Sequence, residues 1–269
     1  MGSAQLEKSL GMKTIHQLGF VKLLDVMGDD EEVENSARIS YGEGTRKVNQ
    51  TRNLIRYLMR HKHTSPFEMC EVKFHLKLPI FIMRQLVRHR TANLNEYSGR
   101  YSVMSNEYYL PEVDYLAKQS TTNSQGRGEV LEQEGLLQFE FNRIYDGAST
   151  AYQVLLEEDL SRELARAVLP VANYTECIWK IDLHNFFHFV KLRSDSHAQR
   201  EIRDYSDAMY ELVKPNFPLC CEAFEDYVQG ATTFSKQEMG VIKELLEYAD
   251  TKAALAGMSV KGAGVLESK

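Results

Sequence analysis

The fold is decided by the stretch Val72-Lys73-Phe74-His75-Leu76-Lys77-Leu78, followed by Pro79 and Ile80-Phe81-Ile82-Met83-Arg84-Gln85-Leu86. The first part alternates apolar and charged side chains with a period of two, which is typical of a strand with one face in the core and one wet face. Pro79 stands at a natural first-turn position, so we expect a helix from Ile80 to about Arg90. A strand that leads directly into a helix indicates a chain that mixes both kinds of element.

The rest of the chain repeats this mixture. Buried strands are expected at residues 20–28 and 175–183, and a loop at 91–102. Helices are expected at 29–38, 48–61, 129–158, 161–169, 184–192, 197–213 and in much of the last forty residues. No internal repeat or linker is visible. The sequence therefore predicts a single α+β domain with a mixed sheet and long helices.

The two ends of the chain differ from the middle. We expect a disordered leader at residues 1–15, the main domain at 16–230, and a helical C-terminal extension at 231–269 that frays near Gly262.

Composition limits the class of protein. The 269 residues are 43% hydrophobic and 26% charged, as in ordinary soluble proteins. No apolar run approaches the ~20 residues needed to cross a bilayer, and the start lacks a secretory signal. Four cysteines without a C-x-x-C pair favour reduced thiols and a cytoplasmic setting. A net charge of −6 argues against non-specific nucleic-acid binding. We therefore expect neither a membrane nor a nucleic-acid partner.

A local basic cluster is unusual in such an acidic chain. Arg84, Arg88, His89, Arg90 and Arg100 fall within seventeen residues that contain one acidic residue. Guanidinium groups suit bidentate binding of phosphate or an anionic ring. A solvated basic helix face is the simpler alternative. The serine and glycine at 98–99, which can form an anion-binding nest, favour a binding loop instead.

The same segment carries a resemblance to a known family. Arg88-His89-Arg90, seven residues and then Ser98 match the R-H-R-x7-S motif of flavin-dependent thymidylate synthases. Further segments resemble the family in the family's order, from about Phe20 to Ala223: His63-x-Ser65-Pro66-Phe67-Glu68, Asn95-Glu96-x-Ser98-Gly99-Arg100-Tyr101-Ser102, Arg166-x-x-Leu169-Pro170 and Leu192-Arg193-x-Asp195-x-His197-Ala198-Gln199.

The resemblance implies an activity and its cofactors. A member of this family methylates dUMP to dTMP, with FAD as the hydride carrier, NADPH as its reductant and methylenetetrahydrofolate as the carbon donor. It is a homotetramer whose sites combine several chains. The glycines at 42–44 and 126–128 do not form the G-x-G-x-x-G fingerprint, so FAD would bind without a Rossmann domain.

The resemblance also implies roles for matching residues. Arg193 would be the catalytic residue, because a permanently charged guanidinium favours the N3-deprotonated uracil ring. FAD would contact Ser65, Arg88, His89, Arg90, Glu96, Asp182, His184, His188 and His197, although some members carry Asn and Arg where Asp182 and His184 stand. The dUMP site would be lined by Gln85, Arg88, Glu96, Tyr97, Ser98, Gly99, Arg100, Arg166 and Arg193. No metal is implied.

Other interpretations stay open at this point. Ser98 is a candidate nucleophile, but no base is placed beside it, so a ligand-binding hydroxyl is favoured. His184 and His188, at i and i+4, have the spacing of zinc ligands, although the H-E-x-x-H pattern is absent. Cys220 and Cys221 are interpreted as structural rather than nucleophilic. The arginines alone would also suit a nucleotide-binding or nucleic-acid-binding module without catalysis.

Overall fold

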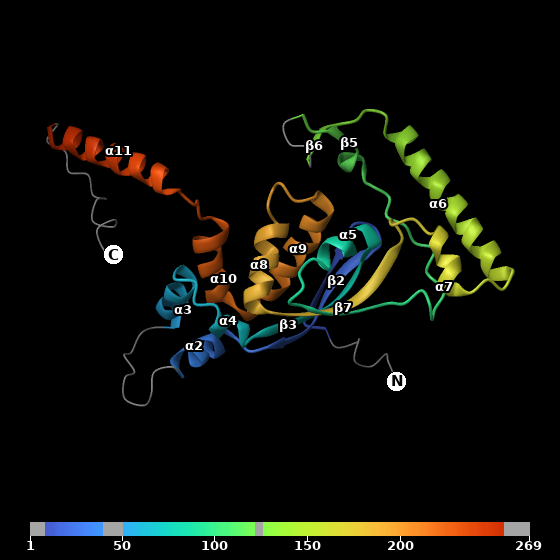
Figure 1. Ribbon diagram of the computed structural model, residues 1–269, viewed down its shortest axis with the longest axis horizontal. Coiled ribbons are helices and arrows are strands. Elements are labelled where there is room, and N and C mark those ends of the chain that lie inside the picture. The colour runs from blue at the N-terminus through green and yellow to red at the C-terminus, as the bar shows by residue number, and fades with distance from the viewer. Residues whose placement is uncertain (1–8, 40–50, 122–125, 256–269) are drawn as a thin grey trace. The chain divides into compact units, whose positions relative to one another are not determined.

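The computed structural model describes residues 9–39, 51–121 and 126–255, with side chains as far as 249 (Figure 1). The chain divides into two compact units, Met1–Gln229 and Gly230–Lys269. The expected fraying near Gly262 and the glycines at 42–44 lie outside the described residues. None of the described helices combines the length and apolar character that crossing a bilayer requires.

The first unit is built on a five-stranded sheet with the order β1-β2-β3-β7-β4. The strands are β1 (Gly11–Ile15), β2 (Gly19–Met27), β3 (Glu71–Pro79), β7 (Tyr174–Asp182) and β4 (Asn93–Glu96). Every pairing among these described strands is antiparallel, so the predicted mixed sheet is wrong. Side-chain periodicity locates a strand but carries no information on its direction, which depends on how distant segments pair.

The predicted alternation of β3 decides which face of the sheet is buried. Phe74, Leu76 and Leu78 are almost fully buried. Phe74 packs against Trp179 of β7 and Phe186, with ring centroids 6.3 and 5.8 Å apart. Helices α8 (Leu183–Arg193) and α9 (Arg200–Val213) contribute to the same core (Figure 1). On the opposite face of β3, Glu71, Lys73, His75 and Lys77 are only partly buried. Ion pairs join this second face to β7 and neighbouring segments.

Four shorter helices complete the core around this sheet. Helices α2 (Asp30–Arg38), α3 (Thr51–Arg60), the one-turn α4 (Ser65–Glu68) and α10 (Pro218–Phe224) contact one another, and a π-helical segment (Glu225–Gln229) follows α10. Buried Asp30 caps α10 by accepting the backbone N–H groups of Leu219 and Cys220 at 2.7 and 2.9 Å. Cys220 and Cys221 are fully buried free thiols, and burial raises the pKa of Cys221 to about 12. Their environment agrees with a structural role.

Most of the remaining elements of the first unit belong to the part of the chain between β4 and β7. They are the 3-10 turn Val113–Tyr115, the hairpin β5 (Ala117–Gln119) and β6 (Arg127–Val130), α6 (Glu134–Glu157), α7 (Arg162–Ala165) and the 3-10 turn Arg166–Val168. Another 3-10 turn, Lys214–Asn216, follows α9. The second unit contains α11 (Lys236–Leu255).

Four expectations about local structure are corrected. Residues 11–15 are strand β1 rather than part of a disordered leader, while residues 1–8 lie outside the described residues. Helix α5 (Ile80–Leu86) ends before Arg88, and the expected loop at 91–102 contains β4. Hairpin β5–β6 was not predicted. The missed strands are three to five residues long, and pairing with distant segments decides such strands more than their own pattern does.

Candidate active site

The arginine turn, which we define as residues 84–90, lies where α5 ends, and the end of α8 meets it there. Arg193 donates from Nε to Nε2 of His89 at 3.1 Å and from Nη2 to the backbone carbonyl of Gln85 at 3.4 Å. His89 also packs edge-on against Phe189, with centroids 4.9 Å apart. Although α5 is shorter than predicted, the structure still brings Gln85, His89 and Arg193 together.

The positive charge at this turn has no acidic counterpart in the part of the chain that the structure describes. Within the described residues, Arg88, Arg90 and Arg193 have no ion-pair partner. Burial and the neighbouring Arg88 lower the pKa of Arg193. Burial, followed by Arg193 and His188, lowers the pKa of His89 to about 4, so its imidazole is neutral and its Nε2 can accept from Arg193. An anionic ligand would relieve this excess of cations.

A second group of predicted residues lines a cavity of about 260 Å³. Glu96, at the end of β4, accepts a hydrogen bond from the Thr175 hydroxyl at 2.9 Å. Ser98 Oγ accepts from the backbone N–H of Arg100 at 3.3 Å, and no base contacts it among the described residues. Predicted residues in the lining are Glu96, Tyr97, Ser98, Gly99 and Arg166.

A side chain at Gly99 would crowd two neighbouring side chains of this cavity. A Cβ added there would lie 2.8 Å from Met104 Sδ and 3.1 Å from Arg166 Cδ. Arg100 lies beside the cavity and forms an ion pair with Glu163 at 3.2 Å, while Arg162 donates to the Tyr101 carbonyl at 3.0 Å. Sequence reasoning missed Thr175 and Met104. Thr175 carries a hydroxyl and Met104 an apolar side chain, both in ordinary segments, and no motif distinguishes them.

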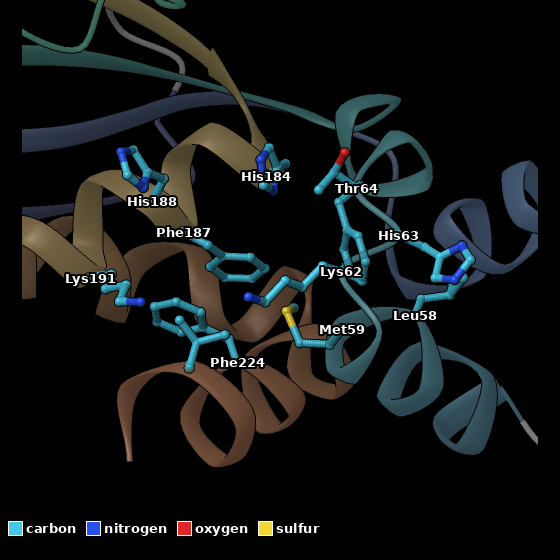
Figure 2. A pocket seen from close by; sticks show the side chains of 12 residues that line it. Leu58, Met59, Lys62, His63, Thr64, His184, Phe187, His188, Lys191 and Phe224 are labelled. Carbon is cyan, nitrogen blue, oxygen red and sulfur yellow. The ribbon is translucent and has the colours of Figure 1, made fainter. Parts of the chain in front are cut away.

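A second cavity, of about 290 Å³, lies between α3, α4, α8 and α10 (Figure 2). His184 and His188 line it from α8, one turn apart, as predicted from their spacing. Its other lining residues combine apolar side chains with cations: Leu58, Met59, Lys62, His63, Thr64, Phe67, Phe187, Lys191, Phe224 and Val228. Ser65 follows Thr64 at the start of α4. No motif in the sequence indicated Lys62, Met59 or Lys191.

The zinc interpretation finds no support in this cavity. His63, His184 and His188 all line it, but Figure 2 shows His63 on the side opposite His188. In the part of the chain that the structure describes, no three His, Cys, Asp or Glu side chains are grouped so that they could hold a metal. Lys62 and Lys191 in the lining would also repel a cation.

Two further predicted residues have partners within the chain. Asp182 caps α8, accepting the backbone and side-chain N–H groups of Asn185 at 2.9 and 2.8 Å. His197 is exposed and contacts Asp195 through Nδ1 at 2.8 Å, which together with the His197 backbone N–H lowers the pKa of Asp195. Neither contact places these residues with the groups above, so their contact with FAD stays a prediction.

The predicted dUMP residues therefore fall into two groups. Gln85, Arg88 and Arg193 lie at the arginine turn, whereas Glu96 to Arg100 and Arg166 surround the 260 Å³ cavity. Across the described ranges, no hydrogen bond or ion pair joins the two groups.

Comparison with known proteins gives the family. Residues 22–219 match the family described as "Thymidylate synthase complementing protein". A flavin-dependent thymidylate synthase from Ehrlichia ruminantium (strain Gardel) is 52% identical over 238 residues, covering 86% of this chain and 79% of that protein. The chain belongs to the flavin-dependent thymidylate synthase family. A further relative of that name, from Dictyostelium discoideum, is 48% identical over 239 residues and covers 85% of this chain and 78% of that protein.

Solved structures agree with this membership. The UMP/dUMP methylase PolB from Streptomyces cacaoi, bound with 5-Br dUMP, has a TM-score of 0.74 and 31% identity, covering 81% of this chain and 99% of that chain. The same enzyme bound with 5-Br UMP has a TM-score of 0.73 and 33% identity, covering 80% of this chain and 97% of that chain.

Proposed function

We propose that this chain is a thymidylate synthase that converts dUMP to dTMP by reductive methylation in dTMP biosynthesis. Family membership supports the enzyme class, and the dUMP methylase structure supports the substrate. The observation that carries the proposal is the arginine turn, where Arg88, Arg90 and Arg193 lack ion-pair partners among the described residues. Cations left unpaired beside a neutral histidine are suited to bind an anionic nucleotide.

Arg193 is the residue we assign to catalysis. Its guanidinium lies partly buried, with Nε on His89 and Nη2 on the Gln85 carbonyl. These two acceptors fix its plane, so the remaining N–H groups point in a defined direction. In contact with the uracil ring, the fixed positive charge stabilises negative charge that develops at N3 and the adjacent oxygens.

FAD is the cofactor that we propose, because the family is named for its dependence on a flavin. The 290 Å³ cavity offers Phe187 and Phe224 to an aromatic ring, while His184, His188 and Lys191 offer hydrogen-bond donors and positive charge. Ser65 follows Thr64 of the lining, and the ring of His89 in the Arg88-His89-Arg90 motif lies 6.3 Å from that of His188. Together these residues would hold FAD without a Rossmann domain. The chemistry supplied by bound FAD is hydride transfer, with NADPH as reductant and methylenetetrahydrofolate as carbon donor.

Assembly of several copies would explain the separation of the two dUMP groups. A nucleotide that contacts Gln85 and Arg88 together with Ser98 and Arg166 needs these groups on opposite sides of one site. We propose a homotetramer in which neighbouring chains supply the two groups of dUMP-binding residues. We also propose that the enzyme works in the cytoplasm. Independent positions on one chain become one site when two copies meet.

UMP is the second substrate to test. PolB is named a UMP/dUMP methylase, so a related scaffold accepts the ribonucleotide. The relatives from Ehrlichia ruminantium and Dictyostelium discoideum, at 52% and 48% identity, are named flavin-dependent thymidylate synthases, which favours dUMP. Nucleotide binding without catalysis is the remaining alternative.

The decisive experiment is a flavin spectrum of the purified protein followed by tritium release from [5-³H]dUMP. We expect the absorption band of oxidised flavin at about 450 nm. We also expect tritium release that requires NADPH and methylenetetrahydrofolate. Parallel assays with [5-³H]UMP give the substrate preference. A protein that binds dUMP but takes up no flavin and releases no tritium would contradict the proposal and favour the non-catalytic alternative.

A further inference from the structure

A buried carboxylate is connected to the arginine turn through one intervening side chain and has no role in the function described above. Glu201, in the first turn of α9, is 1% exposed. Its Oε1 accepts from the Tyr109 hydroxyl at 3.0 Å and from Arg127 Nη2 at 2.5 Å. Its Oε2 accepts from Gln199 Nε2 at 2.9 Å. Burial would raise the pKa of Glu201, but the hydrogen bond and charge of Arg127 outweigh it, so the pKa is lowered and the group is ionised at neutral pH.

Because an ionised carboxylate only accepts hydrogen bonds, it determines the orientation of the next two amides. Gln199 must turn its NH2 group toward Glu201, which leaves its Oε1 facing Gln85. Gln85 must then donate, and its Nε2 lies 2.6 Å from Gln199 Oε1. An amide that rotated by half a turn would place two donors or two acceptors against each other. The direction of every hydrogen bond in the series therefore follows from the charge on Glu201.

We propose that Glu201, acting through Gln199, is a positioning residue that fixes the orientation of the Gln85 amide in the dUMP site. This proposal rests on the proposed function. Gln85 is held at both ends, since Arg193 donates to its backbone carbonyl and Gln199 accepts from its side chain. Its Oε1 is turned away from Gln199 and accepts from an N–H or O–H donor of the nucleotide.

A purely structural role for Glu201 makes a different prediction. The Arg127–Glu201 pair joins hairpin β5–β6 to α9, and losing it would destabilise that attachment whatever Gln85 does. The test must therefore separate the orientation of Gln85 from the stability of the fold. Gln199 permits this separation, because its replacement removes the series without touching Arg127 or Tyr109.

The experiment measures dUMP affinity of the flavin-loaded full-length protein by the change in flavin absorbance, with flavin content and Tm recorded beside it. In Glu201→Gln, the donors Arg127 and Tyr109 hold the new amide oxygen, so the NH2 group faces Gln199 and favours the reversed orientation of its amide. We expect dUMP affinity to fall about tenfold, as for loss of a charge-assisted hydrogen bond. We expect a smaller change in kcat and unchanged flavin content. Gln199→Met, which keeps the length of the side chain, should give the same loss with a wild-type Tm.

Tyr115→Phe is the matched control. Tyr115 donates at 2.6 Å to Asp204, a neighbouring part-buried carboxylate on the same helix, and does not touch Gln199 or Gln85. We expect its dUMP affinity to stay within about twofold of wild type, since its hydrogen bond lies outside the series.

A double-mutant cycle with Gln85→Met decides whether Glu201 acts through Gln85. If it does, Gln199→Met and Glu201→Gln should cause no further loss of dUMP affinity in the Gln85→Met background. Full additivity, or wild-type affinity in Gln199→Met, would overturn the proposal even if Glu201→Gln fails to fold. A wild-type protein that holds flavin but binds no dUMP would overturn the proposed function, and that failure is seen before any variant is made.

Discussion

The polar face of the sheet and the arginine turn both concentrate cations, but they use them in opposite ways. On the sheet, Lys180 contacts both oxygens of Glu71 at 2.5 and 2.7 Å, and Lys77 contacts Glu107 at 2.8 Å. At the turn, Arg193 contacts a neutral histidine and a carbonyl, and Arg88 has no acidic partner among the described residues.

The contrast separates cations that stabilise the fold from cations that are available to bind a ligand. The hydrogen bond from Lys77 lowers the pKa of Glu107, and that from His75 lowers the pKa of Glu176, so these carboxylates are stabilised by their partners. At the turn, by contrast, burial disfavours the charged form and lowers the pKa of Arg193. Keeping an unpaired cation partly buried costs stability, and a bound anion recovers it.

The largest effect is expected at Arg193. Arg193→Ala removes the charge assigned to the uracil ring, and kcat for dTMP formation should fall about 100- to 1,000-fold, as for loss of a transition-state donor. Flavin should largely stay bound, which the absorbance ratio of flavin to protein measures. Unchanged dUMP methylation would refute the role of Arg193.

Arg88 should have the next largest effect. Arg88 is assigned to both dUMP and FAD, so Arg88→Ala should weaken each about tenfold or more, as expected for a charged hydrogen bond. Equilibrium binding of each ligand measures this. Retained affinity for both would contradict the shared assignment, whereas loss of one alone would assign Arg88 to that ligand.

His89 should make the stability of the arginine turn depend on pH. Its folded pKa of about 4 lies below the ordinary value of 6.5, so between these values the unfolded state binds the proton and the folded state does not. Stability therefore falls as the pH drops from 6.5 to 4, by about 1–3 kcal/mol through this group.

His89→Gln keeps an acceptor for Arg193 but does not titrate, so it serves as the matched control. Urea unfolding of both proteins at pH 7 and pH 4.5 measures the difference. The wild type should lose more stability than the variant on acidification. Equal losses would show that His89 is not held neutral by its environment.

The smallest effect is expected on the sheet. Lys180→Met removes one partly exposed ion pair, which should change the free energy of unfolding by about 1 kcal/mol or less. Affinity for dUMP and FAD should stay within about twofold, as measured by the same binding assays. A tenfold loss of either ligand would mean that the paired cations also belong to the site.

Much of the local structure could be read from the sequence. The period of two in β3, the helices α8 and α9 and the cluster of arginines were all predicted, because each is encoded within a few neighbouring residues. The ends of elements were less predictable. Helix α5 was expected to reach Arg90, yet it ends at Leu86, where Arg193 and Phe189 hold His89 in the turn.

The amino-acid sequence alone establishes chemical identity: which side chains are charged, how they alternate, and the R-H-R-x7-S motif of the family. The pairing of strands and of charged side chains depends on the three-dimensional fold. The fold made the sheet antiparallel, gave Lys180 and Lys77 their carboxylates, and left Arg88 without one among the described residues. It also brought Glu201 to Gln85 through Gln199, over 116 positions of sequence (201 minus 85). Local patterns arise from bonded geometry, whereas burial and pairing depend on contacts between distant segments, which no short pattern contains.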